Sequence, residues 1–110
     1  MNLYNEEAVK LANADKHEEA LTNYGRAISG SADEDELLPI FLANRAHSLI
    51  QCDKIDEAIA DCTRATKVDP KCIMAYIAHS KAFLYRGKLG QSLDVLRQAL
   101  SRDKENKGLP

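Results

Sequence analysis

The sequence has no tryptophan, few aromatic residues (5%) and no long apolar run. With so few aromatic side chains the core must form from Ala, Leu and Ile, which favours closely packed helix pairs. No stretch approaches the roughly 20 apolar residues of a membrane span, and the first residues lack the basic and apolar regions of a secretory signal. We therefore predict a cytoplasmic chain with no membrane partner.

An excess of either charge is also lacking. The chain has 15 basic and 17 acidic residues, a net charge of -2, so nothing suggests a nucleic-acid partner. Its three cysteines, Cys52, Cys62 and Cys72, are odd in number and evenly spaced, unlike a disulfide framework. The sequence predicts three reduced thiols, and a regulatory disulfide between two of them is the alternative.

Motifs of catalysis and metal binding are missing as well. No Cys-x-x-Cys, His-x-x-x-His, Gly-rich phosphate loop or nucleophile elbow occurs, and His47 and His79 are scattered. The acidic residues are spread over faces that we expect to be solvent-exposed. The sequence thus predicts no metal, no cofactor and no enzyme activity.

Apolar residues recur at helical spacing in six segments, and no segment has the alternation of a strand. The predicted helices cover about 2–14, 17–29, 33–52, 70–86 and 89–102, and the fourth lies within the stretch 53–70. Gly30 and Gly87 are candidate C-caps, and Pro70 is expected to end the fourth helix and open the fifth. Asp33, with Glu36 three residues later, is expected to cap the third helix, although an acidic recruitment tail is the other interpretation.

The six segments form three pairs with matching patterns. The second helices share small residues around a central position: Ala20, Tyr24 and Ala27; Ala58, Cys62 and Ala65; Ser92, Leu96 and Ala99. The first helices match in the same way: Tyr4, Ala8 and Leu11; Leu42, Ala46 and Leu49; Tyr76, Ser80 and Phe83. The turns between them match at Asp15, Asp53 and Gly87. Because one helix pair cannot bury its apolar stripe alone, we expect the pairs to stack and share a core.

This pattern resembles the tetratricopeptide repeat (TPR) family, whose helix–turn–helix unit has about 34 residues. The resemblance covers about residues 2–104 and implies an all-α, right-handed solenoid of three repeats, at about 1–34, 39–72 and 73–106, with 105–110 as a frayed tail. The closing proline of the family is present as Pro70, whereas Ala32 and Lys104 replace it elsewhere. The four extra residues between the first two units are expected to lengthen the start of the third helix. In this alignment His17 and Cys62 occupy packing positions, so we expect a structural His17 and a buried, inert Cys62.

The segment Asn44-Arg45-Ala46 resembles the second unit of co-chaperone TPR domains. Some of those domains grip an acidic chaperone C-terminus through a clamp of two Lys, two Asn and one Arg, because charge-assisted hydrogen bonds offset the desolvation of carboxylates. Carried over by position, the clamp retains Asn44 alone; the other four donors are replaced, by Asn5, Val9, Met74 and Ala78. The resemblance therefore implies a protein or peptide partner other than an acidic chaperone tail.

The family's inner wall implies a peptide-binding groove on the first helix of each pair. The candidate residues are Asn5, Val9, Asn13, Asn44, His47, Gln51, Met74, Ile77, Lys81 and Tyr85. Ile40 and Ile50 add apolar surface, unless neighbouring helices cover some of these side chains. Lys81 lies one turn from Ala78, the position of the missing clamp arginine, and can contact an acidic group. Such a wall suits a segment with apolar anchors and few charges.

The family's additional solvating helix after the last repeat is not recognisable in the sequence. The sixth helix would then expose part of Leu93, Leu96 and Leu100, either because the chain belongs to a longer protein or because this face pairs with a second copy. The leading prediction is an adaptor that binds a partner peptide in its groove. The alternatives are a self-associating structural module, with a homodimer through the last helix, and a targeting domain of a larger enzyme.

Overall fold

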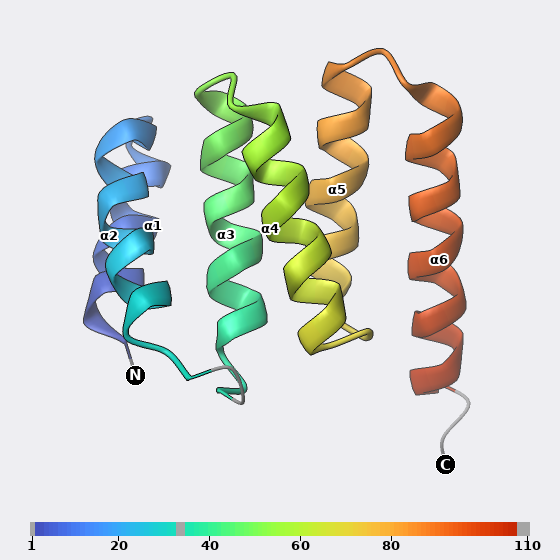
Figure 1. Cartoon of the computed structure of the whole chain (residues 1–110), viewed down its shortest axis with the longest axis horizontal. Coiled ribbons are helices and arrows are strands. Elements are labelled where there is room, and N and C mark those ends of the chain that lie inside the picture. Colours follow the sequence, from blue (N-terminus) through green and yellow to red (C-terminus); the bar gives the residue numbers. More distant parts are fainter. Residues whose placement is uncertain (1, 33–34, 108–110) are drawn as a thin grey trace.

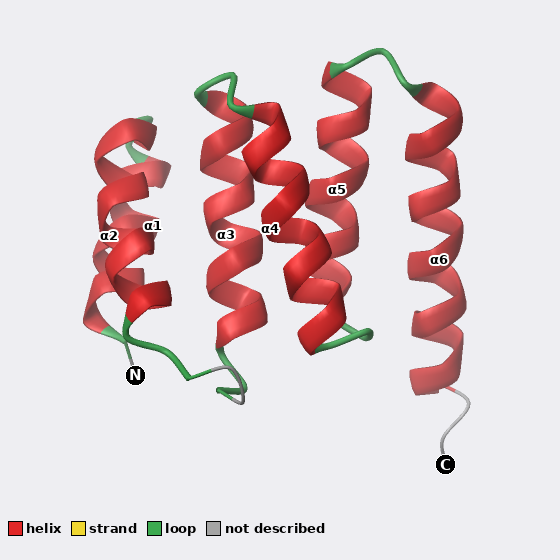
Figure 2. Ribbon diagram, viewed as in Figure 1, coloured by secondary structure: helices red, strands yellow, loops and turns green. Residues whose placement is uncertain are grey.

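The structure is a computed structural model that describes residues 2–32 and 35–107. It contains six helices: α1 (Leu3–Asn13), α2 (His17–Ser29), α3 (Leu38–Gln51), α4 (Ile55–Val68), α5 (Ile73–Tyr85) and α6 (Leu89–Lys107) (Figure 1). The described residues form no strand, which Figure 2 shows at a glance. The prediction of six helices in an all-α fold is confirmed.

Each antiparallel pair crosses at small residues, as the repeat pattern predicts. Ala8 and Ala20 are fully buried in the first pair, and Ala46 and Ala58 are fully buried in the second. In the third pair serines replace the alanines, and the Ser80 and Ser92 hydroxyls share a buried hydrogen bond of 2.6 Å. Small side chains at the crossing let the helix axes approach closely. The serine pair keeps this approach while satisfying both hydroxyl groups.

The turn within each pair has the same backbone geometry. Asp15, Asp53 and Gly87 all have positive φ, at 62°, 62° and 70°. In each turn the next amide bonds to the carbonyl five residues before it, at 2.8 Å. This is the Schellman arrangement, which satisfies carbonyls at a helix C-terminus. Aspartate tolerates the left-handed region better than most residues, so it takes the position that glycine holds in the third turn.

The pairs stack side by side across the view of Figure 1. Helix α3 contacts α1 and α5 as well as α2 and α4, whereas within the described residues no Cα atoms of α2, α4 and α6 come within 8 Å of one another. The first helices of the pairs are therefore closer together than the second helices. Such stacking places α1, α3 and α5 on the inner wall of a curved solenoid.

A buried ion pair joins α3 to α4. Arg45 donates from Nε and Nη2 to the two carboxylate oxygens of Asp61, both at 2.7 Å. The Asp61 side chain is 9% exposed and that of Arg45 is 27% exposed. Our expectation that the acidic residues lie on solvent-exposed faces is therefore wrong for Asp61, because the bidentate guanidinium compensates for its burial.

The third helix begins later than predicted. It starts at Leu38, although the extra residues were expected to extend it; Asp33, the expected cap, lies outside the described residues. The Asp35 carboxylate instead accepts a hydrogen bond from the Leu37 amide at 2.8 Å, which makes a turn. An earlier start would place Pro39 deeper in the helix, where it removes a backbone hydrogen bond and clashes with a carbonyl.

The fifth helix also begins later than the sequence indicates. Pro70 ends α4 as predicted, since the preceding Asp69 is extended (φ −139°), but α5 starts at Ile73. The Asp69 carboxylate accepts the Lys71 amide at 3.0 Å, and the Tyr76 hydroxyl donates to the Pro70 carbonyl at 2.8 Å. These bonds favour a turn over helix at Pro70. The prediction that Pro70 opens the fifth helix is wrong.

The last helix exposes apolar side chains, as predicted. Ser92, Val95 and Ala99 are buried, whereas Leu93 and Leu96 are 43% and 37% exposed and Leu100 is 61% exposed. Leu96 aligns with Tyr24 and Cys62, but its exposure agrees with the prediction for an uncovered sixth helix. Those two residues are buried between stacked pairs, whereas α6 contacts α5 alone within the described residues.

Helix α6 continues to Lys107, beyond the predicted end at about residue 102. Residues 104–107 favour helix or tolerate it, and the first glycine of this segment is at 108. Residues 105–107 of the predicted frayed tail thus belong to α6, and 108–110 lie outside the described residues. No helix in the described ranges has the length and apolar character needed to cross a bilayer.

The Asp61→Ala variant should lose about 2 kcal/mol of unfolding free energy, because the Arg45 guanidinium is left half-buried and unpaired. Urea unfolding of the two proteins measures this difference. Asp94→Ala is the matched control, since Asp94 pairs with Arg97 on the surface (66% and 74% exposed). Its change should stay within about 0.5 kcal/mol. Equal effects of the two substitutions would contradict a structural role for the buried pair.

Candidate functional site

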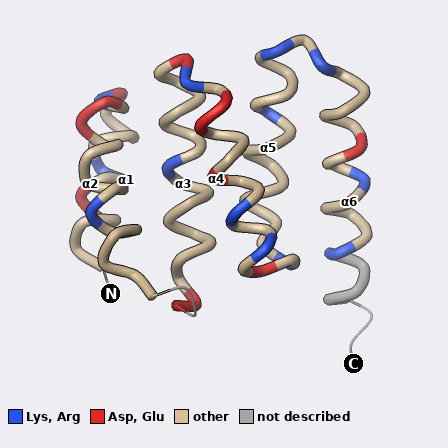
Figure 3. Tube along the Cα trace, viewed as in Figure 1, with Lys and Arg blue, Asp and Glu red and all other residues tan. Residues whose placement is uncertain are grey.

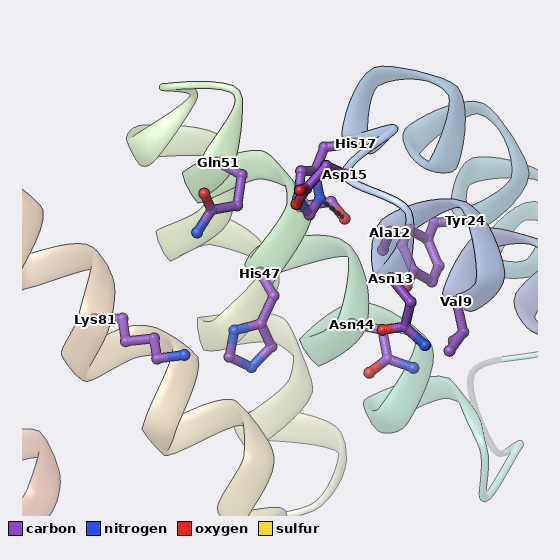
Figure 4. Close-up of a pocket in the computed structure, with 11 residues that line it drawn as sticks. Val9, Ala12, Asn13, Asp15, His17, Tyr24, Asn44, His47, Gln51 and Lys81 are labelled. Carbon is purple, nitrogen blue, oxygen red and sulfur yellow. Dashed lines mark hydrogen bonds and ion pairs between the residues drawn. The ribbon is translucent and has the colours of Figure 1, made fainter.

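A cleft of about 500 Å³ opens on the inner wall, between α1, α3 and α5. Figure 4 shows the side chains that converge on it from these helices, from α2 and from the turn between α1 and α2. The lining residues are Val9, Ala12, Asn13, Asp15, His17, Tyr24, Asn44, His47, Ser48, Gln51 and Lys81. Amide and imidazole groups predominate, so the cleft can donate and accept hydrogen bonds along a bound chain.

The structure brings six of the ten predicted groove residues together in this cleft. They are Val9, Asn13, Asn44, His47, Gln51 and Lys81. Asn5 lies beside it, where its side-chain oxygen accepts a 3.4 Å hydrogen bond from the Asn44 amide. The other three, Met74, Ile77 and Tyr85, do not line the cleft and are 41%, 42% and 61% exposed on α5.

Two isoleucines were expected to add apolar surface to the wall. Ile50 is 3% exposed and packs in the core with Ala78, so its assignment to the wall is wrong. Ile40 is half-buried. The cause is the close contact between α3 and α5, which covers the side of α3 that carries Ile50.

The part of the cleft that comes from α2 was not predicted from the sequence. His17 Nδ1 lies 3.1 Å from the Ser48 hydroxyl, a contact between the first and second pairs. Burial raises the pKa of Tyr24, and a hydrogen bond with Ser48 opposes part of that rise. His17 thus has the structural role predicted for it, but it also lines the cleft. A rule that assigns binding to the first helices alone cannot find residues that belong to a second helix.

The charges around the cleft are few. Helices α3 and α5 carry one cation each, Arg45 and Lys81, and no acidic residue; Figure 3 shows both without red. Arg45 pairs with Asp61 and does not line the cleft. The positive charge among the residues that line the cleft therefore comes from Lys81. Burial lowers the pKa of His47, and the positive charge of Lys81 lowers it further. The neutral imidazole is therefore favoured near neutral pH.

The remaining groups with reactive potential are the three cysteines. Cys52, Cys62 and Cys72 are free thiols, and burial raises the pKa of Cys62 to about 12, as expected for an inert cysteine. In the described ranges no three His, Cys, Asp or Glu side chains are grouped to hold a metal ion.

Comparison with known proteins agrees with this architecture. A family model of the tetratricopeptide repeat matches residues 41–72, which span most of α3 and all of α4. The TPR2B domain of yeast Sti1, solved as a complex with pHsp70, is 27% identical and superposes with a TM-score of 0.81, over 97% of this chain and 86% of that one. The chain therefore contains a tetratricopeptide repeat and shares the fold of TPR domains. Its fold is accordingly a TPR solenoid, with α3 and α4 as the central repeat.

Other TPR proteins are similar over most of the chain. The second TPR of Spaghetti (RPAP3), solved with the HSP90 peptide SRMEEVD, is 25% identical with a TM-score of 0.77, covering 88% of this chain and 86% of that one. The mitochondrial import receptor subunit TOM70 of Homo sapiens is 36% identical over 83% of this chain and 14% of its own length. In three further curated relatives, the chain spans 28%, 9% and 26% of the length of the relative.

The lowered pKa values of His47 and His79, due chiefly to burial, predict a loss of stability in acid. Below their ordinary pKa of about 6.5 the unfolded chain binds more protons than the folded chain, so the stability present above this pH declines as the pH falls. Urea unfolding at pH 7.5 and 5.5 should show a smaller loss for His47→Gln than for the wild type. Equal losses would show that His47 is not responsible.

Proposed function

We propose that this domain is an adaptor that binds an extended or helical segment of a partner protein along α1, α3 and α5, without catalysing a reaction. The observation that carries this proposal is the cleft itself, because side chains from three different repeats converge on one open space. Structural neighbours solved with an HSP90 peptide and with pHsp70 support a peptide as the occupant. The free thiols favour action in a reducing compartment such as the cytoplasm.

The composition of the wall favours a ligand other than the acidic chaperone tail. Asn5 replaces a clamp lysine, and its oxygen accepts the Asn44 amide, so that part of the wall is engaged within the domain. Ala78 is fully buried and Met74 offers an apolar surface instead of a cation. We therefore infer a partner segment with apolar anchors for the exposed side chains of α5 and with main-chain groups for the amides of the cleft.

Self-association is a second candidate function, which the apolar end of the solenoid favours. The last repeat exposes three apolar side chains, Ile77, Leu84 and Leu96. The residues 34 positions earlier in the chain, Ala43, Ile50 and Cys62, are buried beneath the next repeat. The opposite end carries exposed Glu7 and Lys10. A symmetric pairing of two apolar ends fits this asymmetry better than head-to-tail stacking, which would set charges against leucines.

Selection from a displayed library of random heptapeptides tests the adaptor proposal. The wild-type domain should enrich a consensus with apolar residues, and SRMEEVD displayed in parallel should not be enriched. Loss of four donors worth about 1 kcal/mol each weakens a clamp ligand by roughly a thousandfold. Val9→Glu, which places a charge in the cleft, should weaken the selected peptides at least about tenfold.

Leu96→Glu is the control for that selection, since it alters the exposed end and leaves the cleft intact. It should retain peptide binding, while the melting temperature of Val9→Glu shows whether that variant is folded. Tight binding of SRMEEVD that Asn44→Ala abolishes would contradict our account of the groove. Failure of the wild type to enrich any consensus would contradict the adaptor function.

Light scattering coupled to size-exclusion chromatography tests the second candidate. If the apolar end pairs two copies, the mass should approach that of a dimer at high protein concentration, and Leu96→Glu should restore the monomer. Val9→Glu should leave the mass unchanged, because Val9 lies in the cleft and not at this end. A wild-type monomer at high concentration would exclude the dimer.

A further inference from the structure

Two nitrogen-bearing side chains face one another across the cleft. Lys81 extends from α5 towards the ring of His47 on α3, as Figure 4 shows, and both line the same space. Within the described residues neither side chain has a hydrogen-bond or ion-pair partner. An ammonium group and an imidazole that share an open space, with no acceptor between them, leave room for an acceptor from a ligand.

The surrounding groups supply no carboxylate of their own to this position. Helices α3 and α5 contain no Asp or Glu, and the α1 residues that line the cleft are Val9, Ala12 and Asn13. Asp15 lies at the rim, with a carboxylate that is 98% exposed and 3.7 Å from His17 Nε2. The other titratable groups of the cleft are His17 and Tyr24, and Tyr24 bonds with Ser48.

From this arrangement we propose that the cleft binds one carboxylate of the partner segment between Lys81 and His47. The inference rests on the proposed function, since it assumes that a peptide occupies the cleft. The ammonium group and the protonated imidazole both donate charge-assisted hydrogen bonds, which offset the desolvation of the carboxylate. One lysine and one histidine suffice for one carboxylate, so the recognised segment carries a single acidic group at this point and is otherwise largely uncharged.

This subsite differs from the chaperone-tail clamp in its residues and position. The clamp positions on α5 are occupied by Met74 and Ala78, whereas Lys81 is close to one helical turn farther along. Asn44 and Gln51 lie on the same face of α3 as His47. The Gln51 amide and the side-chain oxygen of Asn44, whose nitrogen bonds with Asn5, are placed to bind the main chain of the ligand.

The proposed site couples binding to protonation of His47. In the unbound domain, burial and Lys81 favour the neutral ring. A bound carboxylate favours the charged ring, so the ligand and one proton bind together. Affinity for an acidic peptide should therefore increase as the pH falls from about 7.5 to 6, whereas affinity for the corresponding neutral peptide should not.

The heptapeptide selection supplies the probe for this inference. Peptides enriched by the wild-type domain should share Asp or Glu at one position, and selection on Lys81→Met should lose that preference. A selected peptide is then synthesised with an amidated C-terminus, alongside its Asn or Gln analogue. By calorimetry the analogue should bind the wild type about tenfold more weakly, the effect of one lost charge-assisted contact.

Two further variants make the result specific. Lys81→Met should bind the acidic peptide and its analogue equally, and His47→Gln should remove the pH dependence. Lys67→Met is the matched control, because Lys67 is exposed on α4, away from the cleft, and it should behave as the wild type. The carboxylate could come from an Asp or Glu side chain or from the C-terminus of the peptide, and amidation removes only the second. If the amidated acidic peptide does not bind, the site takes a terminal carboxylate.

The outcomes separate this inference from the proposed function. Enriched peptides with neither an acidic preference nor a need for a free C-terminus would overturn the carboxylate site and leave the adaptor function standing. A preference that persists in Lys81→Met would have the same consequence. No enrichment on the wild type would overturn both. A terminal-carboxylate requirement that Lys81→Met abolishes still supports the site.

Discussion

The close crossing of two helices at small residues is the interaction on which the rest of the structure depends. Ala8 meets α2 near Ala20, Ala46 meets α4 near Ala58, and the third pair substitutes a serine–serine hydrogen bond. A larger side chain at any of these points would separate the helices and tilt one pair relative to the next. The cleft is a product of that spacing, because its walls belong to different repeats.

The helices and their pairing could be predicted because helical periodicity, turn residues and the repeat all agree. The starts of α3 and α5 could not, since Asp35 and Asp69 offer their carboxylates to nearby amides and thereby favour turns over helix. The Arg45–Asp61 pair was also missed. Its two members lie on different helices, 16 residues apart, and no single-helix pattern distinguishes a buried aspartate from a surface one.

The candidate site was predictable only in part. Six groove residues do converge, because the face of a first helix follows directly from its periodicity. The contributions of His17 and Tyr24 depend on how the first repeat meets the second, which the sequence does not specify. The facing arrangement of His47 and Lys81 likewise depends on the contact between α3 and α5, so the sequence suggests each residue singly and the fold makes them neighbours.

The repeated Schellman turns have a consequence for folding kinetics. Each turn brings together positions 12 residues apart, as in Ser80 and Ser92, so the contacts that define a repeat are local in the chain. Local contacts lower the contact order, which favours rapid folding, and they allow any of the three hairpins to serve as the nucleus. The central hairpin is flanked on both sides, whereas α6 contacts α5 alone among the described helices. Hydrogen exchange should therefore be slowest in α3 and α4, with opening that starts at α6.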